Sequence, residues 1–74
     1  MTKEENRKAT AAAVAETIRD ARERKGWTVY RLAKESGLSA GHVFRIERGD
    51  VAVRVDVLHS IIRALGGHII IDWE

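Results

Sequence analysis

The fold of this chain is decided by the stretch Thr28–Gly49, which reads TVYRLAKESGLSAGHVFRIERG. Thr28 and Ser39 are good helix N-caps, and each precedes a short segment with apolar residues at helical spacing. Gly37 and Gly49 close these segments, because glycine readily adopts the positive φ that a helix end or a tight turn requires. The stretch therefore predicts two short helices, over about 29–36 and 40–48, joined by a turn.

The apolar residues of this stretch predict how the two helices pack. Ala33 is small enough for the helices to cross closely, and Leu38 fills the corner between them. Val43 and Ile46 turn one side of the second of these helices toward a core. Its other side is left free and carries Gly41, Phe44, Arg45 and Arg48.

Two further helices flank the stretch. The segment 4–25 is rich in alanine, glutamate and arginine, carries an apolar stripe at Val14, Ile18 and Ala21, and ends at Gly26. The segment 55–65 has apolar residues at helical spacing and is followed by two glycines. We expect a domain over 11–66, preceded by a flexible polar end over 1–10.

The last segment, 67–74, differs from the rest, because HIIIDW is β-branched and aromatic and is typical of a strand. A lone strand leaves its backbone groups unpaired, so its simplest partner is the same strand of a second copy. The fold class expected is therefore mainly all-α, with four helices and a C-terminal strand that pairs across a homodimer. A frayed apolar tail or a short fifth helix are the alternatives. The residues expected at the dimer contact are Ile69, Ile70, Ile71 and Trp73.

Composition narrows the classes of function. The chain has 74 residues, which allows one domain, and it has no cysteine, which excludes disulfides and thiolate zinc sites. Its three histidines, His42, His59 and His68, lack the spacing of metal ligands, so neither metal nor cofactor is expected. The acidic residues are scattered, which disfavours an enzyme. No segment is long enough to cross a membrane and the first residues do not form a signal peptide, so a cytoplasmic protein is expected.

The central stretch resembles the helix-turn-helix of the phage-repressor (Xre/Cro) family. The resemblance runs from about residue 14 to residue 66. The residues that carry it are Ile18, Arg22, Gly26, Trp27, Thr28, Leu32, Ala33, Ser36–Ser39, Val43, Arg45–Gly49, Val55, Leu58 and Ala64–Gly66. It implies a repressor-like four-helix domain whose third helix enters the major groove of double-stranded DNA.

The resemblance also implies roles for individual residues. The base-facing positions are Ala40, Gly41, His42, Phe44 and Arg45. The phosphate-contacting positions are Thr28, Val29 (through its backbone N–H), Arg31, Ser39, Arg48 and Arg54. Arg22 and Glu47 match a buried ion pair with a structural role, and Trp27 is expected in the core rather than as a stacking platform. For Arg45 the alternative is a solvated side chain.

The chain also departs from the family pattern. Val29 stands where relatives often have glutamine, and Ala40 and Gly41 offer no polar side chain to the bases. The loop 50–53 is acidic and apolar where relatives are often basic.

Two functions from different classes follow. The first is a sequence-specific, DNA-binding transcriptional regulator, expected to act as a homodimeric repressor. The second is a protein-interaction module similar to the HipB-type antitoxins, whose main role is to bind a toxin or another protein. The second rests on the C-terminal strand, the long first helix, the motif Gly26-Trp27-Thr28 and the apolar residues Val51, Val53 and Val57.

Overall fold

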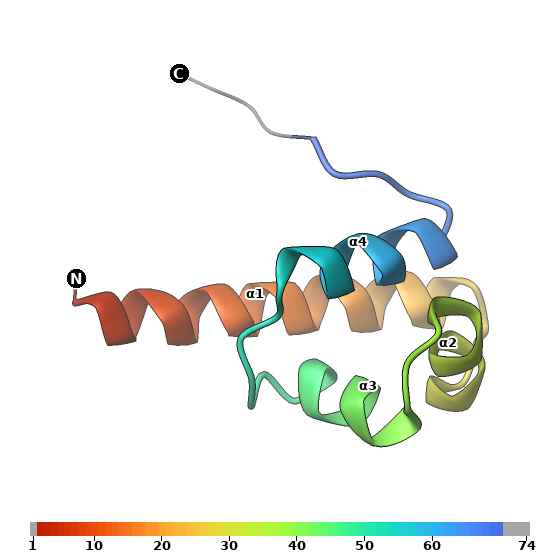
Figure 1. The fold of residues 1–74 in the computed structure, drawn as a ribbon, viewed down its shortest axis with the longest axis horizontal. Helices are drawn as coiled ribbons and strands as arrows, with labels where there is room; N and C mark the ends of the chain where they lie inside the picture. Colours follow the sequence, from red (N-terminus) through yellow and green to blue (C-terminus); the bar gives the residue numbers. More distant parts are fainter. Residues whose placement is uncertain (1, 71–74) are drawn as a thin grey trace.

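The computed structural model describes residues 2–70, and over that range it consists of four α-helices (Figure 1). They are α1 (Lys3–Arg24), α2 (Val29–Ser36), α3 (Ala40–Glu47) and α4 (Val55–Ala64). The long helix α1 runs the length of the molecule, with α3 on one side of it, α4 on another and α2 near its C-terminal end. The observed bounds lie within one residue of those predicted from the sequence, and the all-helical fold is confirmed for the described residues.

The turn between α2 and α3 forms from the local signals in the sequence. The Thr28 hydroxyl oxygen accepts a hydrogen bond from the Arg31 N–H at 3.1 Å, and the Ser39 hydroxyl accepts one from the His42 N–H at the same distance. Gly37 ends α2 with a φ of 74°. These caps satisfy backbone groups that a helix terminus otherwise leaves without a partner.

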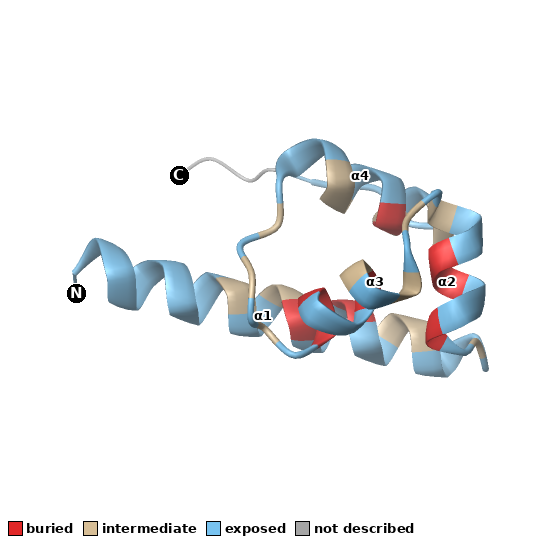
Figure 2. Ribbon diagram, turned by 60° about the horizontal axis from the view of Figure 1, so that its bottom comes forward, coloured by how far each residue is buried: buried red, intermediate tan, exposed pale blue. Residues whose placement is uncertain are grey.

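The core lies where the four helices face one another (Figure 2). Its most deeply buried side chains are at most 1% exposed, and they are Ile18, Leu32, Val43, Ile46 and Ile61. Val51, Val53 and Val57 are partly buried and pack against this cluster. The sequence suggested that these three valines are surplus apolar residues available to a partner. In the structure part of each side chain is used in core packing, with Val51 and Val53 coming from the loop before α4 and Val57 from α4 itself.

The N-terminal end of the described residues is helical. The structure continues α1 through the segment 3–10, for which the sequence predicts a flexible end. Thr2 and Glu5 form a capping box, in which the Glu5 N–H donates to the Thr2 hydroxyl at 3.1 Å and the Glu5 carboxylate accepts from the Thr2 N–H at 3.4 Å. All side chains in this segment are exposed, so it is held by helix propensity and capping rather than by tertiary packing.

The C-terminal segment leaves α4 at two glycines. Residues 68–70 form no strand, and the described residues 2–70 of this single chain contain no other strand with which they could pair. Ile69 and Ile70 are 40% and 81% exposed. Ile71 and Trp73, the other two residues of the expected dimer contact, lie outside the described residues. The intersubunit strand therefore stays a prediction.

None of the helices between residues 2 and 70 combines the length and the hydropathy that a bilayer-spanning helix needs.

Candidate nucleic-acid interface

Helix α3 is fixed by one buried side and presents the other to solvent. Val43 and Ile46 are fully buried, and Glu47 is only 7% exposed. The exposed face of α3 carries Gly41, Phe44, Arg45 and Arg48, the four residues that the sequence predicts to be free. A rigid helix with such a face is the part of a helix-turn-helix that enters a major groove.

An ion pair locks the C-terminal end of α3 to α1. Arg22 Nε lies 2.7 Å from Glu47 Oε2, and Arg22 Nη2 lies 2.8 Å from Glu47 Oε1, so the guanidinium is held by both carboxylate oxygens. Its third nitrogen, Nη1, donates to the Trp27 carbonyl at 2.8 Å. The hydrogen bond to Glu47 raises the pKa of Arg22 above its ordinary value, although burial acts in the opposite direction. The ion pair expected from the sequence is thus present.

A second arginine of α1 supports the same end of α3. Arg19 Nη1 donates to the backbone carbonyl of Glu47 at 3.1 Å. The last carbonyls of a helix have no partner within the helix, so this bond satisfies one of them. The sequence reasoning missed Arg19. Its spacing of three residues from Arg22, on the same side of α1, is the signal that was available.

The N-termini of α2 and α3 provide the backbone donors of the site. Thr28 and Ser39 are both exposed at the N-caps, and each hydroxyl keeps its own proton while its oxygen caps the helix. The Val29 side chain is only 8% exposed and belongs to the core, so only its backbone N–H is suited to a phosphate. That N–H lies in the first turn of α2, where it has no partner within the helix.

The base-facing surface is narrower than the resemblance implies. Ala40 is partly buried and packs against the core, and His42 is also partly buried. Both residues therefore lie at the edges of the exposed face of α3. The center of that face is formed by Gly41 and Arg45, with Phe44 beside them.

Three of the four candidate DNA-contacting arginines are paired with nearby carboxylates. The pairs are Arg31–Glu35 at 3.0 Å, Arg48–Asp50 at 2.9 Å and Arg54–Asp56 at 3.3 Å. Arg45 is exposed and has no carboxylate partner within residues 2–70. Exposed ion pairs are weak, so a DNA phosphate is able to replace the carboxylate of each pair.

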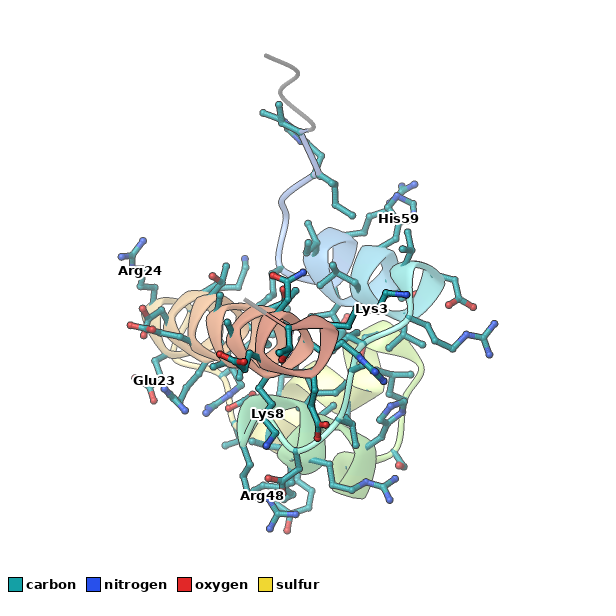
Figure 3. All side chains as sticks on the ribbon, turned by 90° about the vertical axis from the view of Figure 1, so that its left-hand side faces the viewer. Lys3, Lys8, Glu23, Arg24, Arg48 and His59 are labelled. Atoms are coloured by element: carbon teal, nitrogen blue, oxygen red, sulfur yellow. The ribbon has the colours of Figure 1, made fainter. Side chains whose placement is uncertain are left out.

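Figure 3 places Arg48 on the α3 side of the molecule, away from the side that carries His59 of α4 and the C-terminal segment. Figure 1 shows the same separation, with α3 on one side of α1 and the C-terminal segment on the other. The candidate interface and the C-terminal segment are therefore on different sides of the molecule.

Trp27 lies against the core rather than on an open surface. It is partly buried and packs on the core cluster, as the sequence predicts. Lys25 Nζ and Arg31 Cζ lie 5.0 and 4.7 Å from the centroid of its ring. The two cations cover the ring and leave it poorly suited to stack on a base.

Tyr30, to which the sequence assigns no role, contacts the candidate interface. Its ring meets that of Phe44 edge to face, with centroids 6.0 Å apart and an interplanar angle of 82°. The two rings are 68% and 43% exposed. The contact joins α2 to the exposed face of α3.

The fold and this site define a helix-turn-helix domain. The helix-turn-helix family model matches residues 18–70, and the chain belongs to this family of DNA-binding regulators. Nothing among the curated proteins or the solved structures matches the chain.

Proposed function

We propose that this protein is a sequence-specific transcriptional repressor that binds DNA as a homodimer. The observation that carries the proposal is the position of Arg45, an exposed guanidinium that has no carboxylate partner among residues 2–70, on a helix that is locked in place by Arg22 and Glu47. A guanidinium in the major groove pairs with guanine O6 and N7, which is the commonest specific contact between proteins and DNA.

The backbone contacts follow from the two helix N-termini. The N–H groups of their first turns point out of the helix and attract anions, and the hydroxyls of Thr28 and Ser39 are close by. Arg48 and Arg54 add positive charge once a phosphate replaces Asp50 or Asp56 as their partner. These contacts orient α3, while the bases are read by the residues on its exposed face.

A homodimer is supported by the side of the molecule away from α3. An apolar groove of about 380 Å³ lies between α1 and α4, and its lining includes Val14, Ile18, Leu58 and Ile62. Gly67 and His68 also line this groove, so the C-terminal segment starts at it. In the proposed dimer the C-terminal segments of two copies pair next to this groove, and α3 of each copy remains free to bind DNA.

The test is selection of DNA by the purified full chain from random duplexes at a stated, moderate salt concentration. An enriched inverted repeat, with half-sites about one helical turn apart, supports the proposal. Binding without enrichment that weakens steadily as salt rises contradicts it, because such binding uses phosphates alone.

The second candidate function is binding of a partner protein in the manner of an antitoxin. The observation in its favour is the same groove between α1 and α4, together with the exposed Ile69 and Ile70. A toxin, or another protein with an apolar surface, would then occupy the groove that the dimer proposal assigns to a second copy. Selection without enrichment, from a chain that is monomeric in sedimentation, favours this function.

A further inference from the structure

Tyr30 and Phe44 are large apolar side chains that are exposed at the candidate interface. Single exposed apolar side chains are common and need no explanation. These two differ because they contact each other from separate helices, with ring centroids 6.0 Å apart, and because Phe44 shares the exposed face of α3 with Arg45. Tyr30 is also two residues beyond the Thr28 N-cap, next to the proposed phosphate contacts.

The surroundings of Phe44 leave it as the main apolar group that is able to reach a base. Gly41, one turn earlier, has open space where a Cβ would lie, with nothing within 4 Å. Ala40 is partly buried against the core. His42 carries the one polar side chain in the N-terminal half of α3, and it is partly buried. This half of the helix therefore offers no exposed polar side chain to the edges of the bases.

The major groove offers one apolar group to such a surface, the C5-methyl group of thymine. We propose that Phe44 contacts a thymine methyl group, that Tyr30 positions the Phe44 ring, and that each half-site therefore places a thymine next to the guanine read by Arg45. This inference rests on the proposed function and names the kind of DNA sequence that the site binds.

The role of Tyr30 follows from ring geometry. An edge-to-face contact restrains the rotation of an exposed ring that has no other aromatic partner among the described residues. A restrained ring loses less side-chain entropy when it is buried against DNA. Tyr30 is therefore a positioning residue, and it acts through its ring rather than through its hydroxyl.

The experiment uses the duplex enriched by selection and the full chain. Each thymine of a half-site is replaced in turn by deoxyuridine, which removes only the C5-methyl group. The wild-type chain should bind one of these duplexes about fourfold more weakly, the value expected for one buried methyl group. Phe44→Ala should bind the thymine and deoxyuridine duplexes equally.

Two variants at Tyr30 distinguish the contribution of its ring from that of its hydroxyl group. Tyr30→Phe should keep the preference for thymine, and Tyr30→Ala should reduce it. Arg45→Ala is the matched control, because it should weaken binding to both duplexes and leave their ratio unchanged. Circular dichroism checks that each variant is folded, which is expected because neither ring is part of the buried core.

Three outcomes would overturn the inference. If the wild-type chain is insensitive to methyl removal at every position, or if Phe44→Ala keeps the full preference for thymine, the inference is wrong while the proposed function stands. If no duplex is enriched at all, both fail.

Discussion

Arg45 is the residue on which base readout depends in the proposed function. We expect Arg45→Ala to weaken binding to the selected duplex by about 1–3 kcal/mol, because a bidentate contact to guanine is lost. The fold should be unaffected, since the side chain is exposed. Fluorescence anisotropy at fixed salt measures the affinity.

Arg63→Ala is the control for Arg45→Ala. Arg63 is an exposed arginine in the last turn of α4, so its removal lowers the net charge equally without touching α3. Equal losses from the two variants would show that Arg45 acts only through its charge and does not read a base.

Glu47 is expected to contribute to the stability of the fold rather than to DNA binding. Glu47→Gln removes the buried counter-charge of the Arg22 guanidinium and leaves only the exposed carboxylate of Glu23 near it, and we expect the free energy of unfolding to fall by about 3 kcal/mol. The pKa of Arg22 is raised in the folded chain, so the charged guanidinium contributes fully to stability at any pH below the ordinary arginine pKa. That contribution is lost as the pH rises through the raised pKa, in strong alkali. Urea denaturation at neutral pH measures the change.

Glu23→Gln is the matched control for Glu47→Gln. The Glu23 carboxylate lies 4.0 Å from the same guanidinium, but its side chain is 62% exposed. Its removal should change stability by less than about 1 kcal/mol. Similar losses from both variants would contradict a special role for the buried pair.

The turn between α2 and α3 is tested by an alanine substitution at Gly37, with the same substitution at Gly41 within α3 as the control. Gly37 has a φ of 74° with nothing within 4 Å of a built Cβ, so Gly37→Ala should lower stability by about 1 kcal/mol through backbone conformation alone. Gly41 lies within α3 and has equally open space, so Gly41→Ala should raise stability by up to about 1 kcal/mol. Thermal unfolding of both variants measures this. A stabilising Gly37→Ala would contradict the assignment of the turn.

At the same scale, the sequence predicted the four helices well. Their ends depend on N-caps such as Thr28 and Ser39 and on glycines such as Gly37, and these signals act within a few residues. The N-terminal end was harder to predict. The polar composition of residues 1–10 indicates a flexible end, whereas the capping box of Thr2 and Glu5 begins α1 at Lys3.

At the scale of the whole molecule, the proposed homodimer is tested by measuring the oligomeric state of the chain. A chain truncated after Gly67 should be a folded, helical monomer if the C-terminal segments make the dimer, because the four helices keep their core. Sedimentation velocity on the full and truncated chains measures this. A truncated chain that remains dimeric would show that another surface forms the contact.

Ile70→Asp gives the same test without shortening the chain. Ile70 is 81% exposed in the single chain, so the substitution should not affect the fold of a monomer. In the proposed dimer it would place two charges at an apolar contact, and we expect it to weaken association. A variant that associates as strongly as the wild-type chain would remove Ile70 from the interface.

The sequence by itself determined the helices, the turn, most of the core and the partnership of Arg22 with Glu47, the last through resemblance to a family. The tertiary structure alone decided that Arg19 caps α3, that Tyr30 meets Phe44, that Ala40 and His42 turn partly inward, and that the valines of the loop before α4 are partly buried against the core. The physical reason is the range of the interactions. Capping and periodicity act over a few neighbouring residues, whereas these contacts depend on how each helix is rotated and placed against the others.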